Sequence, residues 1–104
     1  MKRLLLALLL GACAKSAEPG SCYRGQDNAC VEYDGARGAA GKHLCAGQTW
    51  RAGAGTCPRE GRVGTCTKKD VTEIVYAGPP NNFGAASAQA ACEHGGGAFT
   101  GTSP

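Results

Sequence analysis

The apolar residues of this chain are concentrated at its amino end. Leu4 to Leu10 form an unbroken apolar run that directly follows Lys2 and Arg3. A positively charged start leading into a short hydrophobic segment is typical of an export signal. As a helix, this run would extend over about 10 Å, whereas the hydrocarbon core of a bilayer is about 30 Å thick. We therefore interpret residues 1–12 as a targeting segment that takes no part in the fold.

The run ends in Leu10-Gly11-Ala12-Cys13, an aliphatic residue and two small residues before a cysteine. This motif resembles the lipobox of bacterial lipoproteins. The resemblance implies that residues 1–12 are a cleaved lipoprotein signal peptide, that the Cys13 sulfur carries a diacylglycerol, and that the new amino group is acylated with a chain such as palmitate. Acylated Cys13 would then bind membrane lipid stably. The alternative is a soluble secreted protein cut at a small-residue site near Ala12-Cys13-Ala14.

Beyond the signal, the pattern becomes small and polar and then periodic. Residues 13–21 are interrupted by Pro19-Gly20 and predict a flexible tether. The remaining residues, 22–104, form one cysteine-rich domain. Within it the same order of features occurs twice, in 22–56 and 62–100: a cysteine, turn residues, a short β-prone segment, a small-residue stretch ending in a cysteine, and then an aromatic residue.

This order predicts a small disulfide-rich α+β fold with two degenerate hairpin-helix-strand repeats. Chance similarity between stretches rich in glycine and alanine is the alternative. The residues expected in the core are apolar positions of the two units: Val31, Tyr33, Trp50, Val63, Val71, Ile74, Val75, Tyr76, Phe83 and Phe99.

The two predicted helices differ in strength. Ala85 to His94 consists almost entirely of good helix formers, and Gly95 is expected to end the helix in a left-handed conformation. Ala85, Ala88 and Cys92 share one face, so this face can lie close against a sheet. The first helix, about Ala36 to Ala46, includes two glycines that each cost about 1 kcal/mol relative to alanine. We attribute these glycines to composition, because Gly35-x-x-Gly38-x-x-Gly41 lacks the context of a dinucleotide-binding loop.

Composition explains why cross-links are needed. The chain has 17 Gly, two Phe, one Trp and three Tyr, too little bulky apolar surface to stabilise so small a domain by burial alone. It also has seven cysteines, an odd number, and lipidation of Cys13 accounts for the seventh. Equivalent copies would pair the remaining six as Cys22–Cys45, Cys66–Cys92 and Cys30–Cys57. Such bonds require an oxidising compartment, in agreement with export.

The net charge of +3 first suggests nucleic acid or an anionic surface as a partner. Loss of Lys2 and Arg3 with the signal leaves nine of the 11 basic residues against 8 acidic ones. The exported chain is therefore close to neutral. Basic residues do not alternate with aromatic residues, as single-strand binding would require, and we expect no nucleic-acid partner.

Few side chains indicate catalysis. Glu32 and Asp34 flank Tyr33 and would point to the same face of a strand, although solvent-facing charges are the commoner explanation. A zinc site would use His43 with Cys45 and Cys92 with His94, but these pairs are closer in sequence than the ligand pairs of structural zinc sites. We expect no metal, no cofactor and no catalytic residues. A small hydrolase or metal-dependent enzyme using Glu32, Asp34, His43 or His94 is the alternative.

The whole chain resembles small cysteine-rich, lipid-anchored or secreted proteins of Gram-negative bacteria with a duplicated unit. The resemblance depends on Cys30-Val31-Glu32-Tyr33, Cys45 with Trp50, Cys57-Pro58, and Arg62-Val63-Gly64-Thr65-Cys66. It implies a membrane-anchored lipoprotein of the bacterial cell envelope, and Ala14 after the lipid-bearing cysteine resembles the default signal for the outer membrane. We expect a non-catalytic binding or structural module for an envelope protein or polysaccharide. A secreted inhibitor or toxin-like module is another alternative.

Overall fold

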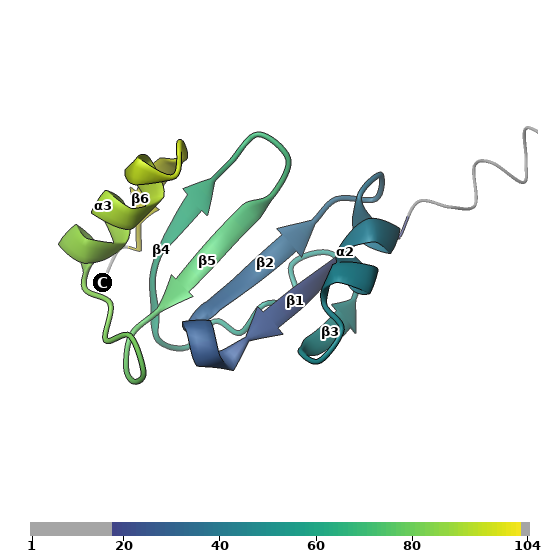
Figure 1. Ribbon diagram of the computed structural model, residues 1–104, viewed down its shortest axis with the longest axis horizontal. Helices are drawn as coiled ribbons and strands as arrows, with labels where there is room; N and C mark the ends of the chain where they lie inside the picture. The colour runs from purple at the N-terminus through teal and green to yellow at the C-terminus, as the bar shows by residue number, and fades with distance from the viewer. Residues whose placement is uncertain (1–17, 103–104) are drawn as a thin grey trace, which may run out of the picture.

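The computed structural model describes residues 18–102, so Cys13 and the signal segment lie outside the described residues. The described chain forms one antiparallel sheet with two α-helices packed on the same face (Figure 1). With three disulfides, this is the small disulfide-rich α+β fold that the sequence predicts. Its elements in chain order are β1 (Gly20–Arg24), the 3-10 turn η1 (Gly25–Asp27), β2 (Ala29–Tyr33), α2 (Gly38–Leu44), β3 (Thr49–Ala52), β4 (Arg62–Thr67), β5 (Thr72–Tyr76), α3 (Ala85–His94) and β6 (Ala98–Gly101).

The strands lie in the order β3-β1-β2-β5-β4-β6, and every neighbouring pair is antiparallel. In each half of the chain, a hairpin is followed by a helix and then by a strand that returns beside the first strand of the hairpin. The two halves meet at the centre of the sheet, where β2 pairs with β5 (Figure 1). Residues 53–61 lead from β3 at one edge to β4, and this linker crosses the face opposite the helices.

The ordered fold begins earlier than the tether prediction allows. Gly20 and Ser21 belong to β1, where they pair with both β2 and β3. Even Glu18 is held by the fold, because its N–H donates to the carbonyl of Gly35 at 3.2 Å. Ser21 is buried, and its Oγ accepts a hydrogen bond from the Thr56 hydroxyl at 2.8 Å. The prediction of a tether was therefore wrong for residues 18–21, whereas residues 13–17 lie outside the described part of the chain.

The second helix has the predicted bounds, Ala85–His94. Ser87 Oγ accepts a hydrogen bond from the Gly84 N–H at 3.0 Å, which satisfies a backbone donor at the start of this helix. Ala88 and Cys92 are buried, whereas Ala85 is exposed. The left-handed residue after the helix is Gly96, with φ of 84°, and not Gly95, as predicted. The first helix is shorter than expected and covers Gly38–Leu44.

The two faces of the sheet have separate cores. On the helix face, three buried residues are surrounded by half-buried ones, and the set is Ala29, Val75 and Ala88 with Val63, Phe83 and Phe99. The cluster on the opposite face is Cys30, Cys57, Ile74 and Tyr76, with Tyr23 packed against it. Four of the predicted core residues are buried: Val31, Ile74, Val75 and Tyr76. The other six are half-buried: Tyr33, Trp50, Val63, Val71, Phe83 and Phe99.

Three disulfides connect the sheet to the segments that cover it. They join Cys22 to Cys45, Cys66 to Cys92 and Cys30 to Cys57, the same pairs as in the sequence analysis. The first two attach α2 and α3 to the sheet, and the third attaches the crossing linker to the opposite face. All six sulfurs belong to buried residues, so the disulfides supply much of the apolar core.

The glycines of α2 have a structural role, and the attribution to composition was wrong. A Cβ added at Gly38 would overlap the carbonyl of Glu18. A Cβ at Gly41 would lie 2.5 Å from Cγ of the Tyr33 ring. Both positions are buried, and the small residue allows the helix backbone to lie directly on the strand and on the chain entering it.

Tyr76 connects the crossing linker to the sheet and provides a pH-dependent contribution to stability. Its side chain is only 6 % exposed, and Oη donates a hydrogen bond to the Pro58 carbonyl at 2.7 Å. Burial raises the pKa of Tyr76 above its ordinary value of 10.0, and the nearby Arg62 guanidinium opposes this shift.

We expect the free energy of unfolding to decrease as the pH rises above about 10, because the unfolded chain releases the Tyr76 proton before the folded chain does. The contribution is complete below the unfolded pKa and is lost as the pH rises through the folded pKa. Urea unfolding of the protein and of Tyr76→Phe at pH 8 and at alkaline pH measures this effect. The stability difference between the two proteins should narrow with pH, and a constant difference would contradict the prediction.

Candidate functional site

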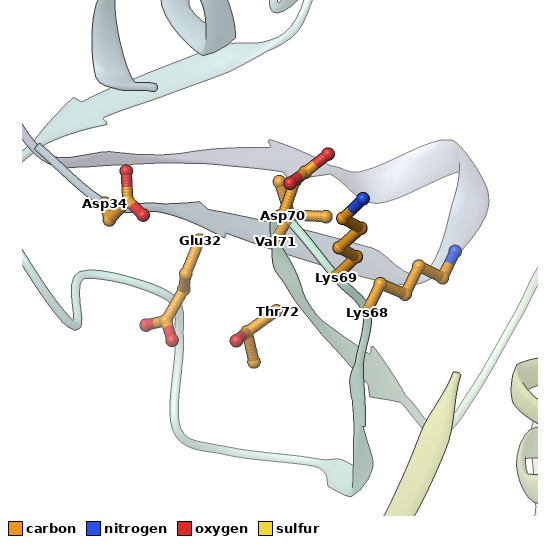
Figure 2. A pocket seen from close by; sticks show the side chains of 7 residues that line it. All are labelled: Glu32, Asp34, Lys68, Lys69, Asp70, Val71 and Thr72. Carbon is orange, nitrogen blue, oxygen red and sulfur yellow. The ribbon is translucent and has the colours of Figure 1, made fainter. Parts of the chain in front are cut away.

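An open, polar pocket of about 200 Å³ lies where β2 ends and the β4–β5 turn begins. Seven residues line it: Glu32, Asp34, Lys68, Lys69, Asp70, Val71 and Thr72 (Figure 2). Figure 2 shows the carboxylates of Glu32 and Asp34 on the β2 side and the two lysines on the hairpin side. Asp70 adds a third carboxylate on the hairpin side, so the pocket presents charges of both signs.

Sheet register brings these residues together. Glu32 in β2 is directly opposite Thr72 in β5, so both side chains project from the same face. The turn between β4 and β5 is closed by a hydrogen bond from the Lys68 N–H to the Val71 carbonyl at 2.9 Å. Lys68 also lies 3.7 Å from the Glu73 carboxylate, so one of the two lysines is already paired.

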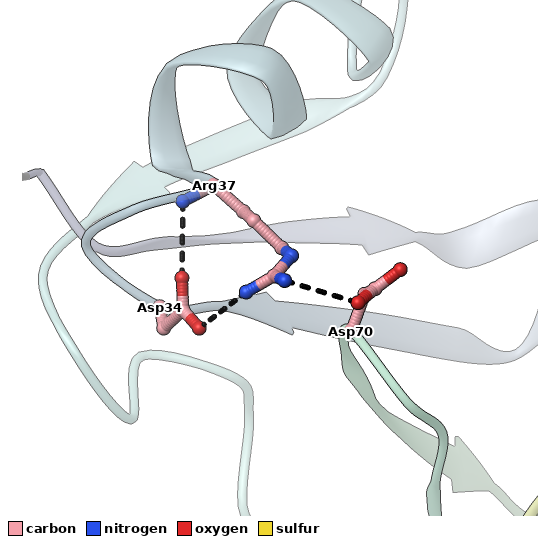
Figure 3. A network of polar contacts seen from close by, with 3 residues as sticks. All are labelled: Asp34, Arg37 and Asp70. Atoms are coloured by element: carbon pink, nitrogen blue, oxygen red, sulfur yellow. Dashed lines mark hydrogen bonds and ion pairs between the residues drawn. The ribbon is translucent and has the colours of Figure 1, made fainter.

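Arg37, the residue that precedes α2, braces the pocket from outside. Its guanidinium lies 3.0 Å from Asp34 and 3.0 Å from Asp70, and the Arg37 N–H donates to the same Asp34 carboxylate (Figure 3). These contacts connect the end of β2 to the β4–β5 turn in the other half of the chain. All three side chains are about half exposed, so the network orients the turn more than it stabilises the fold.

The remaining candidates from the sequence lie elsewhere. Glu32 and Asp34 line one pocket, whereas neither His43 nor His94 does. His43 is exposed near the end of α2 and His94 is exposed at the end of α3, over different halves of the sheet (Figure 1). Cys45 and Cys92 are in disulfides, so their sulfurs are not thiolates that could bind zinc beside these histidines. Within residues 18–102, no three His, Cys, Asp or Glu side chains are grouped to hold a metal ion.

Several polar residues with structural roles were missed from the sequence. Asn28 is buried in a left-handed conformation, with φ of 51°, and its amide donates to the carbonyls of Tyr76 at 3.1 Å and Ala77 at 3.3 Å. Arg37 and Asp70 were not selected either, although Asp34-x-x-Arg37 has a spacing that favours a local ion pair. The pairing of Arg37 with Asp70 joins residues far apart in sequence, so no local spacing predicts it.

Comparison with known proteins adds no relative. No family model, curated protein or solved structure matches the chain. Over residues 18–102, no helix combines the length and the hydropathy that crossing a bilayer requires. A functional assignment therefore depends on the residues of this chain and on the surfaces described above.

Proposed function

We propose that this protein is a lipid-anchored module of the bacterial cell envelope that binds or positions another envelope component without catalysing a reaction. The observation that carries the proposal is the lipobox Leu10-Gly11-Ala12-Cys13, followed closely by a domain with three disulfides. Lipidation of Cys13 would place the domain at a membrane surface. The disulfides fit the same location, because they persist only in an oxidising compartment.

The short distance between Cys13 and the fold limits how the domain is presented. Among the residues that the structure describes, Glu18 is the first with a backbone hydrogen bond to the domain, and five peptide units separate it from Cys13. A chain of this length spans at most about 17 Å. The domain would therefore stay close to the bilayer, with the start of β1 and the end of β2 toward the membrane. The polar pocket beside the end of β2 is then within reach of other components at that surface.

The domain is, in this proposal, built from two degenerate copies of one hairpin-helix-strand unit. Cys22 pairs with Val31 in one hairpin and Cys66 pairs with Glu73 in the other. If the cysteines are equivalent, then Val31 and Glu73 are equivalent too. These two residues pair with each other where β2 meets β5, as two copies related by a two-fold axis require.

Packing details support the same equivalence. Each strand cysteine is preceded, two residues earlier, by a glycine that an aromatic ring covers. Trp50 covers Gly20 before Cys22, and Phe99 covers Gly64 before Cys66. Four residues before each helix cysteine is the small residue that faces the sheet. It is Gly41 against the large Tyr33 and Ala88 against the smaller Val75. By this register Tyr33 corresponds to Val75, because Gly20 pairs with Tyr33 and Gly64 pairs with Val75.

We expect the mature protein, isolated from membranes of a Gram-negative host, to begin at Cys13 and to carry a diacylglycerol and one further acyl chain. Intact-mass measurement before and after reduction reports the lipid, the cleavage site and the three disulfides together. Cys13→Ser is the matched control. This variant should carry no lipid and should no longer be found in the membrane fraction. A mature protein with an unmodified amino end would contradict the proposal.

A second experiment tests binding. A photo-crosslinking amino acid in place of Lys69 lies at the pocket, whereas the same residue in place of Lys42 lies on the exposed side of α2. In whole cells we expect reproducible adducts with one envelope component at position 69 and not at position 42. Absence of a reproducible adduct at position 69, with the lipidated protein present at normal levels, would argue against the pocket as the binding surface.

A further inference from the structure

The end of the crossing linker forms an exposed loop that presents one arginine. Cys57 is buried in the sheet core, whereas the next residues before β4 turn outward, and Arg59, Glu60 and Gly61 are exposed. Among the residues that the structure describes, no side-chain hydrogen bond or ion pair involves Arg59. Its guanidinium is free to meet a partner.

The backbone on both sides of Arg59 is held in place. On the amino side, Cys57 is bonded to Cys30, and the Pro58 carbonyl accepts hydrogen bonds from Arg62 Nε at 2.8 Å and Tyr76 Oη at 2.7 Å. On the carboxyl side, the Gly61 carbonyl accepts a hydrogen bond from the Ala77 N–H at 2.8 Å.

Arg62 connects the two sides of the loop directly. It follows the loop in sequence, yet its guanidinium also donates to the Cys57 carbonyl at 3.0 Å. The Arg59–Glu60 peptide bond thus lies within a short segment whose two ends are fixed to the same scaffold. A loop held in this way loses little conformational entropy on binding.

The position of the loop also favours recognition. It precedes the first residue of β4 and contacts the last residue of β5, whereas Glu18 enters beside the last residues of β2. These two regions lie at opposite ends of the strands (Figure 1). In a protein anchored through its amino end, the loop would point away from the membrane.

We propose that residues 57–61 dock in the active site of a serine protease that cleaves after arginine, and that the protein inhibits this enzyme. The occupant is inferred from the free charge of Arg59 and from the fixed ends of the loop. Such proteases have an aspartate at the base of the S1 pocket, which pairs with an inserted arginine, and protease–inhibitor interfaces form with little backbone movement. Arg59 would occupy S1, and the Arg59–Glu60 bond would lie at the catalytic serine.

Hydrolysis of that bond consumes one water and yields the Arg59 carboxylate and the Glu60 amine. The contacts of Pro58, Arg62 and Gly61 hold the new ends near each other. This proposal goes beyond the proposed function and does not require a lipid on Cys13.

The test measures inhibition of trypsin by the detergent-solubilised full-length protein and by Cys13→Ser. We expect tight inhibition by both, and chymotrypsin, which lacks the acidic pocket, should not be inhibited. Arg59→Ala should raise the inhibition constant at least about 30-fold, as for a central interface residue, while Arg59→Lys should retain inhibition. Arg51→Ala, which removes an exposed arginine of β3 and leaves the loop sequence intact, is the matched control and should leave inhibition unchanged.

The variant Arg62→Ala tests whether the loop acts as an inhibitor or as an ordinary substrate of the protease. Loss of its hydrogen bonds should speed cleavage of the Arg59–Glu60 bond by at least about tenfold, as followed by mass spectrometry, with the disulfides still intact. Rapid cleavage of the original protein at this bond without inhibition would overturn the proposal. Inhibition that is the same for Arg59→Ala would overturn it as well. Failure of lipidation at Cys13 would contradict the proposed function but leave this result unaffected.

Discussion

Replacing Cys30 and Cys57 together by alanine is expected to lower the free energy of unfolding by about 3 to 5 kcal/mol. The bond closes a loop with a sequence separation of 27, for which chain entropy alone accounts for about 3.5 kcal/mol. Both sulfurs also lie at the centre of the core on the face opposite the helices, beside Ile74 and Tyr76. Their loss removes packing as well as a cross-link, and the crossing linker is then attached to the sheet covalently only at its two ends, where it continues into β3 and β4.

Guanidinium unfolding of the double variant gives the stability change, and amide hydrogen exchange shows where protection is lost. The matched control is Cys66→Ala with Cys92→Ala, which opens a loop with a similar separation of 26. Both variants should be strongly destabilised, but only the first should expose the amides of residues 53–61. Equal protection of this linker in the two variants would show that Cys30–Cys57 does not hold it.

Gly41→Ala is expected to destabilise the protein by about 2 kcal/mol, although alanine is the better helix former by about 1 kcal/mol. The sign is reversed because the new Cβ would lie 2.5 Å from the base of the Tyr33 ring. Tyr33 is on β2, inside the sheet, and its ring also lies against Trp50, with 5.9 Å between the ring centroids. The ring therefore has little room to move, and the helix is held near it by Cys22–Cys45.

Urea unfolding of four proteins isolates this contact: the original, Gly41→Ala, Tyr33→Ala and the double variant. Without the Tyr33 ring, Gly41→Ala should become stabilising by about 1 kcal/mol, as helix propensity predicts. Gly84→Ala is a control at an open position, where an added Cβ meets no other atom within 4 Å, and it should destabilise only by the N-cap preference for glycine over alanine, about 0.5 to 1 kcal/mol. Destabilisation by Gly41→Ala that persists without the ring would contradict this explanation.

Local patterns were sufficient for much of the fold. The run of helix formers from Ala85 to His94 was sufficient to predict α3, and its bounds were predicted correctly. The order of cysteines and aromatic residues indicated strands, helices and disulfide pairs. Two of the disulfides attach a helix segment to a strand in the same half, and the third attaches the crossing linker to β2. Helix α3 could be predicted from residues that are neighbours in sequence, and the disulfide pairs from the number and order of the cysteines.

Contacts between distant segments were not predictable in the same way. The glycines of α2 appeared unfavourable because helix propensity includes neither the Tyr33 ring beneath Gly41 nor the Glu18 carbonyl against Gly38. Gly20 and Ser21 looked like part of a tether because their pairing partners lie in β2 and β3. Only one side of the pocket was predicted from the sequence, where Glu32 and Asp34 were candidates. Asp70 and the two lysines come from the other half of the chain and are placed beside them by the sheet register and by the ion pair with Arg37. Arg59 was not selected from the sequence for the same reason, because the conformation of its loop depends on hydrogen bonds from Arg62 and Tyr76 to the Pro58 carbonyl.

The disulfides are distributed unequally across the point where the chain turns outward at Arg59. Two of them lie entirely within residues 18–59, one lies entirely within residues 60–102, and none joins these two segments. A chain opened between Arg59 and Glu60 is thus a pair of separately cross-linked polypeptides. Their reassembly depends on backbone hydrogen bonds between β2 and β5 and on the contact of Tyr76 with Pro58 and the Cys30–Cys57 cluster. In this sense the domain has the construction of a split protein, two oxidised fragments that complement each other along one strand pair.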